Sequence, residues 1–179
     1  DNVDSVSRKG TKGTVQFTDG KGEKQTIESD VVIVSVGRRP RSENIGLEQN
    51  SIALDERGFV NVNPTMRTSV AGVWAVGDIV ATPQLAHVGF AEGMIAIQDI
   101  LGESPTPIEY SKVPWGIYSH PEVSFCGMTE DQAKEAGYDI VVKKEGFIGD
   151  GRAVIIGETD GFVKIIAEKD GPLLGVHIV

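Results

Sequence analysis

Residues 68–78 read TSVAGVWAVGD, and this run decides how the middle of the chain is interpreted. It predicts a hydrophobic strand that delivers Gly77 and then Asp78 at its carboxyl end, ahead of residues 84–87 (QLAH), which open a predicted helix. In open α/β sheets, ligands bind in the crevice outside the strand ends. A glycine lets a backbone approach a ligand closely, and a carboxylate accepts hydrogen bonds from sugar-like hydroxyls. The run therefore predicts a ligand-binding turn.

The residues upstream predict an antiparallel hairpin followed by a buried strand. Residues 14–18 alternate apolar and polar side chains, Asp19-Gly20 is a turn signal, and residues 25–27 resume the strand pattern. Residues 30–36 (DVVIVSV) are almost continuously apolar, which is typical of a strand buried on both faces. That predicted strand ends at GRRP, residues 37–40.

The residues around the opening run predict connecting structure and one long helix. Residues 59–62 predict a strand. Thr82 is expected to cap a helix whose first residue is Pro83 and which runs to about Leu101, where Gly102 ends it. Two glycines inside this helix indicate close packing against a neighbour: Gly89 and Gly93.

Residues 104–107 (SPTP) predict a domain boundary, and the sequence after it has an α+β pattern. Thr129 is expected to cap a short helix that Gly137 closes. Hairpin-type turns are predicted at Asp160-Gly161 and at Asp170-Gly171. The predicted strands are residues 115–118, 123–126, 140–142, 153–156, 162–167 and 173–179.

The composition of the chain argues against several classes of function. A formal net charge of −9 argues against a nucleic-acid partner, which requires a concentrated basic face. No apolar run is long enough for a membrane span. The single cysteine, Cys126, excludes an internal disulfide framework and fits a reducing compartment, so a cytoplasmic location is expected. The chain opens on Asp1 and stops inside an apolar run, which suggests a piece of a longer protein.

Several landmarks, in the right order, resemble one family, the pyridine nucleotide-disulfide oxidoreductases. Residues 34–40 look like the end of its nucleotide domain, and residues 68–78 with 84–87 look like the returning flavin-domain segment. The dimerisation domain of the family is matched by residues 113–118, 121–123, 127–130, 151–153, 159–164 and 174–177. Within the family, LAH at 85–87 and GRRP at 37–40 favour the dihydrolipoamide dehydrogenase group over the glutathione and mercuric reductases.

The resemblance implies a fold that is α/β plus α+β, as expected for a fragment of a two-dinucleotide-binding flavoprotein with the start of its dimerisation domain. Residues 1–40 would end the NAD-binding domain, residues 41–105 would be the returning segment of the FAD-binding domain, and residues 106–179 would be a truncated dimerisation domain. The parent would form a homodimer, associate with a 2-oxoacid dehydrogenase complex, and pass electrons from dihydrolipoamide through an enzyme disulfide and FAD to NAD.

The same resemblance supplies candidate cofactor residues. Those assigned to FAD are Gly77, Asp78, Gln84, Leu85, Ala86 and His87, and the one assigned to NAD is Gly37. Asp78 would accept a hydrogen bond from a ribityl hydroxyl, and residues 84–87 would present backbone amides at a helix start, where partial positive charge favours an anion. Each of these residues also has an alternative interpretation. Asp78 would be part of an ordinary strand-to-helix turn, and His87 would serve in packing. For Gly37, a glycine that merely makes the turn is as probable as one that contacts the nucleotide.

No catalytic residue of the family is found in this chain. A redox cysteine pair cannot be formed with one cysteine, and no Gly-x-Gly-x-x-Gly fingerprint or carboxyl-terminal His-Pro-Thr segment is present. Residues 120–122 (HPE) imitate that segment at the wrong landmark, and no cluster has metal-ligand spacing. The isolated chain is therefore expected to be inactive. The alternatives are a relative of mercuric or glutathione reductase, and a non-catalytic dimerising module made from residues 106–179.

Overall fold

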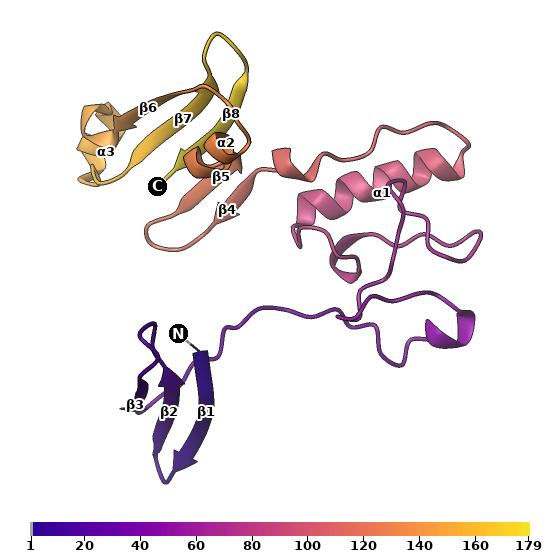
Figure 1. Ribbon diagram of the computed structural model, residues 1–179, viewed down its shortest axis with the longest axis horizontal. Coiled ribbons are helices and arrows are strands. Elements are labelled where there is room, and N and C mark those ends of the chain that lie inside the picture. Colours follow the sequence, from indigo (N-terminus) through magenta and orange to yellow (C-terminus); the bar gives the residue numbers. More distant parts are fainter. Residues whose placement is uncertain (1) are drawn as a thin grey trace. The chain divides into compact units, whose positions relative to one another are not determined.

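A computed structural model describes residues 2–179, which divide into two units (Figure 1). The first unit ends at Arg39, and the second comprises Pro40–Val179. Each unit is described by itself.

The first unit is an antiparallel three-stranded sheet in the order β1-β2-β3. Its strands are β1 (Asn2–Lys9), β2 (Lys12–Thr18) and β3 (Lys24–Ser29). The Asp19 carboxylate closes the turn after β2 by accepting hydrogen bonds from the backbone amides of Lys21 and Glu23, at 2.9 and 3.0 Å. The hairpin predicted over residues 14–27 is therefore confirmed.

The strand predicted over residues 30–36 is not formed, which corrects the sequence-based prediction. These residues adopt no regular secondary structure, and Ile33 and Val36 are 86% and 88% exposed. A strand buried on both faces needs a hydrogen-bonded neighbour on each side. None of residues 2–179 pairs with this run, so most of its apolar side chains remain at the surface, while Val32 is half-buried.

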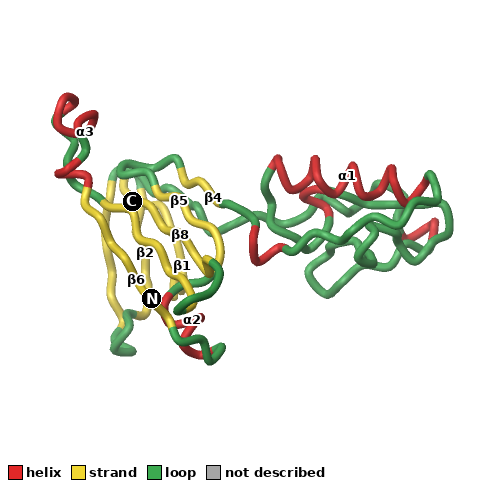
Figure 2. The backbone as a smooth tube through the Cα atoms, turned by 90° about the horizontal axis from the view of Figure 1, so that it is seen from above, coloured by secondary structure: helices red, strands yellow, loops and turns green. Residues whose placement is uncertain are grey.

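The second unit begins with a long irregular segment, drawn mostly as green loops around one helix in Figure 2. The strands predicted at residues 59–62 and ahead of Gly77 are absent, and only single bridges form, such as the one between Arg67 and Trp74. Positive φ angles at Met66 (66°) and Gly72 (79°) turn the chain twice, so it cannot extend as a strand. The segment instead packs a small apolar core, in which buried Met66, Ile95 and Ala96 are covered by Val62, Trp74 and Ile108.

The long helix, α1 (Ala86–Ile100), begins later than predicted. Leu85 is its N-cap and supplies no side-chain hydrogen bond, so Thr82 does not cap it. Gly102 ends it with a φ of 78°, as predicted. A Cβ atom on Gly89 would lie 3.4 Å from the Cα of Gly77, which confirms close packing at this glycine, whereas nothing lies within 4 Å of a Cβ on Gly93.

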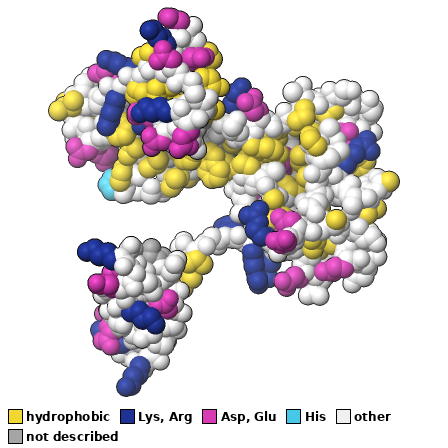
Figure 3. Space-filling model, in the orientation of Figure 1, with side chains coloured by type: hydrophobic (Ala, Val, Ile, Leu, Met, Phe, Trp, Pro, Cys, Tyr) yellow, Lys and Arg dark blue, Asp and Glu magenta, His cyan; other side chains and the backbone are white. Residues whose placement is uncertain are grey.

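The carboxyl-terminal part of the second unit is an antiparallel sheet in the order β4-β5-β8-β7-β6. It confirms the α+β prediction, and most predicted strands are present. The strands are β4 (Trp115–Ile117), β5 (Val123–Gly127), β6 (Ile140–Gly146), β7 (Phe162–Glu168) and β8 (Leu173–Ile178). Hydrophobic side chains reach the surface of this unit in Figure 3.

Two short helices flank the sheet. In α2 (Glu130–Glu135), Thr129 caps the helix as predicted, and Gln132 Oε1 accepts a hydrogen bond from the Thr129 backbone amide. The strand predicted over residues 153–156 is wrong, because α3 (Gly151–Ile156) occupies it. The Asp150 carboxylate accepts the Ala153 amide at 2.9 Å, and Gly157, with a φ of 74°, ends the helix, so both of its ends favour a helix.

The remaining elements are turns and single-turn 3-10 helices. Asp170-Gly171 joins β7 to β8, as predicted, whereas Asp160-Gly161 follows α3 and does not form a tight hairpin. The 3-10 helices are η1 (Glu48–Asn50), η2 (Gly77–Ile79), η3 (Tyr110–Lys112) and η4 (Phe147–Gly149). Among residues 2–179, no helix has the length and apolar character needed to cross a bilayer.

Candidate functional site

The Gly77-Asp78 turn is built by a change of backbone conformation. Val76 is extended, with φ −143° and ψ 159°, and Gly77 then takes a φ of 76° and starts η2. The Val80 amide closes the turn on the Gly77 carbonyl at 3.0 Å, and the Val60 amide donates to the Ile79 carbonyl at 2.9 Å. Val80 is completely buried. The turn is therefore anchored on both sides, and a positive φ at its start favours glycine.

The Asp78 side chain is exposed at the surface of this turn. Its carboxylate makes no hydrogen bond or ion pair with any other of residues 2–179, while Gln84 Nε2 donates to the Asp78 backbone carbonyl at 3.4 Å. A carboxylate that its own protein leaves unpaired keeps its full capacity to accept hydrogen bonds from hydroxyl groups. The turn can therefore bind a polyhydroxyl ligand through Asp78.

The start of α1 lies next in the chain and offers backbone donors. The Leu85 carbonyl accepts the amides of Val88 and Gly89, at 3.0 and 3.1 Å. The amides of Ala86 and His87 belong to the first turn of the helix, which has no carbonyl acceptors of its own, and no residue within 2–179 accepts from them. Such amides carry partial positive charge and bind electron-rich groups.

His87 is turned toward a different partner. Its Nε2 atom lies 3.0 Å from the Pro114 carbonyl oxygen, so the ring donates a hydrogen bond to the segment that enters β4. This bond supports the packing role for His87 over a role as a base.

One residue of the site was missed by sequence reasoning. Glu92, on α1, is fully buried, and its Oε2 and Oε1 atoms accept hydrogen bonds from the Gly77 amide (2.6 Å) and the Tyr110 hydroxyl (3.0 Å). Burial, together with the neighbouring Glu92 carboxylate, raises the pKa of Tyr110 well above its usual range. The sequence signal that could have identified Glu92 is its helical spacing, because it lies on the same face of α1 as buried Val88 and Ile95.

Gly37, the residue assigned to NAD, lies in the first unit, apart in the chain from the residues assigned to FAD. Its φ of 109° requires glycine, and no atom lies within 4 Å of where a Cβ would be. The strained backbone explains the glycine without any ligand, so its nucleotide role stays a prediction.

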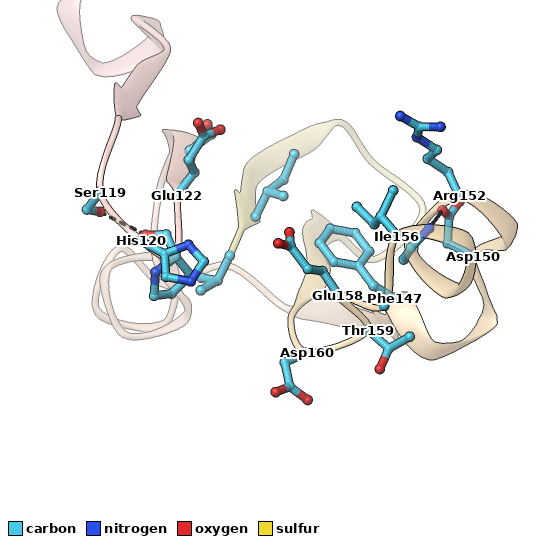
Figure 4. Close-up of a pocket in the computed structure, with 16 residues that line it drawn as sticks. Ser119, His120, Glu122, Phe147, Asp150, Arg152, Ile156, Glu158, Thr159 and Asp160 are labelled. Carbon is cyan, nitrogen blue, oxygen red and sulfur yellow. Dashed lines mark hydrogen bonds between the residues drawn. The ribbon is translucent and has the colours of Figure 1, made fainter.

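An open hollow of about 910 Å³ lies elsewhere in the second unit (Figure 4). Residues 119–122 form one side, with His120 and Ser119 labelled there, and Phe147, Ile156 and residues 158–160 form the other. None of the residues assigned to FAD or NAD lines this hollow. Residues 120–122 line this hollow, and their exclusion as a catalytic segment stays a prediction.

Comparison with known proteins identifies the family. The model of pyridine nucleotide-disulphide oxidoreductases matches residues 2–93, and the model of the dimerisation domain of the same family matches residues 113–179. The chain belongs to the pyridine nucleotide-disulphide oxidoreductase family.

Individual relatives agree with this family. The chain is 44% identical to a dihydrolipoyl dehydrogenase of Cupriavidus necator and 42% identical to one of Bacillus subtilis, in each case over 99% of its own length. It spans only 38% and 39% of those relatives.

Two solved structures share the fold. LpdA of Mycobacterium tuberculosis superposes with a TM-score of 0.84 at 27% identity, over 99% of this chain and 38% of that protein. The HOCl-induced flavoprotein disulfide reductase RclA of Escherichia coli superposes with a TM-score of 0.87 at 27% identity, over 99% of this chain and 40% of that protein.

Proposed function

We propose that this chain is part of an FAD-dependent dihydrolipoamide dehydrogenase, in which it forms one wall of the flavin site. The observation that carries the proposal is the unpaired carboxylate of Asp78 on an anchored turn, next in the chain to the unpaired amides of α1. The similarity to dihydrolipoyl dehydrogenases, which is 44% in the Cupriavidus necator relative, supports the choice of substrate.

The described residues fit a flavin in chemical terms. Asp78 would accept a hydrogen bond from a ribityl hydroxyl, and the amides of Ala86 and His87 would face the electron-rich edge of the ring system. Gln84 would support the turn through its bond to the Asp78 carbonyl. When bound, FAD would supply the electron transfer between a dithiol and NAD, and these residues would hold and orient it.

The domain assignment follows the same proposal. Residues 1–40 would end the NAD-binding domain, with Gly37 near the nucleotide, and residues 41–105 would return to the FAD-binding domain. Residues 106–179 would belong to the dimerisation domain, a role supported by the match of its family model to residues 113–179. The whole protein would be a homodimer that works with a 2-oxoacid dehydrogenase complex.

The chain alone would not catalyse the reaction. Electron transfer from dihydrolipoamide in this family passes through a cysteine pair, and Cys126 is the single cysteine of this chain. Cys126 lies half-buried in β5, with its Sγ 3.1 Å from the Lys112 carbonyl oxygen, so it serves as a packed side chain.

A second candidate is a disulfide reductase with another substrate, favoured by the likeness to RclA of Escherichia coli. Assays of the full protein that contains this sequence decide between them. We expect NAD reduction with dihydrolipoamide, no oxidation of NADPH by glutathione disulfide or Hg²⁺, and no activity from residues 1–179 alone. Failure of the full protein to oxidise dihydrolipoamide would contradict the proposal.

A further inference from the structure

Glu92 is the one fully buried charged side chain among residues 2–179. Burying a carboxylate is costly unless its oxygens are hydrogen-bonded. Both oxygens have such a partner, and the two partners come from different segments, the Gly77 amide and the Tyr110 hydroxyl. Glu92 therefore joins three parts of the second unit at one point.

The first bond holds the candidate flavin turn against α1. Gly77 donates its amide to Glu92 at 2.6 Å, a short bond of the charge-assisted kind. A Cβ on Gly89, one helical turn before Glu92, would lie 3.4 Å from the Gly77 Cα. The turn thus lies directly on the helix, and this contact sets where the exposed Asp78 carboxylate stands relative to the helix start.

The second bond ties the same helix to the segment that enters the five-stranded sheet. Tyr110 begins η3, two residues before Lys112 and shortly before β4. A tyrosine hydroxyl is neutral at physiological pH and can donate, and burial beside Glu92 raises the pKa of Tyr110 further. The bond from His87 to the Pro114 carbonyl attaches this segment to α1 a second time.

We propose that Glu92 is a positioning residue of the flavin site, which holds the Gly77-Asp78 turn on α1 and, through Tyr110, links that turn to the entry of the dimerisation domain. The inference rests on the proposed function, because it assigns Glu92 a role in the site where Asp78 binds FAD.

The test compares variants of the full protein that contains this sequence, with FAD as the probe. Glu92→Met keeps the length of the side chain and removes both acceptors, whereas Glu92→Gln keeps an acceptor for Gly77 and can donate to the Tyr110 oxygen. The control is Asp99→Ala, on the same helix and two turns beyond Glu92, which removes the acceptor of a 2.7 Å hydrogen bond from Trp74 Nε1. Dissociation constants for FAD and thermal midpoints are measured for each protein.

We expect Glu92→Met to weaken FAD binding about 10-fold, equal to about 1.4 kcal/mol, and Glu92→Gln to restore it to within about 3-fold of the wild type. Asp99→Ala is expected to lower the thermal midpoint without changing the affinity for FAD. Wild-type affinity in Glu92→Met, no rescue by Gln, or an equal loss in Asp99→Ala would overturn the inference.

Two further outcomes of this experiment can be told apart: a Glu92→Met variant that does not fold, and a wild-type protein that binds no FAD. If Glu92→Met does not fold, Tyr110→Phe decides, because it removes one donor only; a weaker affinity for FAD supports the link and an unchanged affinity contradicts it. If the wild-type protein binds no FAD, the proposed function fails and this inference fails with it. Binding by the wild type with equal binding by the variants leaves the proposed function intact and rejects the inference alone.

Discussion

Residues 31–36 (VVIVSV) and 173–178 (LLGVHI) are both apolar runs of the same length, but their structures differ. The second is β8, which lies inside its sheet with β5 on one side and β7 on the other. The first pairs with no residue among 2–179, and its Ile33 is 86% exposed. The difference shows that an apolar run becomes a strand only when the chain also supplies its neighbours.

The same contrast bears on function. The five-stranded sheet takes all its pairing partners from residues 115–178. The run at 31–36 has the pattern of a parallel strand, whose neighbours would come from elsewhere in a nucleotide-binding domain. If the chain is part of a dihydrolipoamide dehydrogenase, as proposed above, we expect the run to become a strand in the full enzyme, since the chain spans 38% of its Cupriavidus necator relative.

The largest expected effect on stability is at Gly175, near the centre of β8. A Cβ on Gly175 would lie 2.0 Å from the Met128 carbonyl oxygen, a distance that real contacts do not reach. We expect Gly175→Ala to lower the free energy of unfolding by more than about 4 kcal/mol. Urea unfolding, followed by Trp115 fluorescence in a Trp74→Phe background, measures it. The control Gly151→Ala has no atom within 4 Å of its Cβ, and an equal loss there would contradict the steric explanation.

The next comparison uses one isoleucine from each region. Ile166 is completely buried on β7, beside β8, whereas Ile33 is exposed. We expect Ile166→Ala to cost about 3 kcal/mol of stability and Ile33→Ala less than about 0.5 kcal/mol. Urea unfolding and hydrogen exchange of the β7 and β3 amides report the two units separately. A cost at Ile33 similar to that at Ile166 would mean that residues 31–36 are packed.

A smaller effect is expected at Thr129, the N-cap of α2, because this cap depends on neighbouring residues and not on long-range strand pairing. The Gln132 backbone amide donates a hydrogen bond to Thr129 Oγ1 at 3.3 Å, and Gln132 Oε1 accepts one from the Thr129 backbone amide at 2.9 Å. We expect Thr129→Ala to cost about 1 kcal/mol, the usual worth of an N-cap. Exposed Thr106 makes no side-chain hydrogen bond among residues 2–179, and Thr106→Ala serves as the control in the same urea experiment.

The smallest effect is a dependence on pH. The hydrogen bond from Lys164 to Glu130, together with the positive charge of that lysine and of Lys134, lowers the pKa of Glu130 below its usual value. A carboxylate with a lowered pKa in the folded state stabilises the fold above its unfolded pKa, and this contribution is lost as the pH falls through the folded pKa.

We therefore expect Glu130→Gln to reduce the stability of the sheet slightly at pH 7 and to have no effect near pH 2. Urea unfolding midpoints of both proteins across this range measure the difference. A difference that stays constant with pH would exclude the ionic contribution.

The elements predicted correctly from the sequence are those with complete local signals. The Asp19 turn, the Thr129 cap and the Asp170-Gly171 turn are each specified within a few residues. Residues 153–156 were misread as a strand, because a four-residue apolar run does not distinguish the two structures and the cap at Asp150 was overlooked.

The candidate site was predictable to a similar degree. The assignment of Gly77, Asp78 and residues 84–87 to FAD came from a resemblance and stays a prediction, while the structure shows Gln84 Nε2 donating to the Asp78 carbonyl. Glu92 was missed because its partners, Gly77 and Tyr110, lie 15 and 18 residues away, and a sequence does not reveal such contacts. Side-chain contacts, like the strand pairing of the two apolar runs, thus depend on partners elsewhere in the chain.

The central claim is that the turn at Asp78 binds FAD, and a titration of the full protein that contains this sequence tests it most directly. A charge-assisted hydrogen bond contributes about 2 kcal/mol, so we predict that Asp78→Ala weakens FAD binding about 30-fold. Glu103→Ala, which removes an exposed carboxylate that makes no side-chain hydrogen bond or ion pair among residues 2–179, is the matched control, with an expected change of less than about 3-fold. An affinity for FAD that is the same in Asp78→Ala and in the wild type would contradict the account.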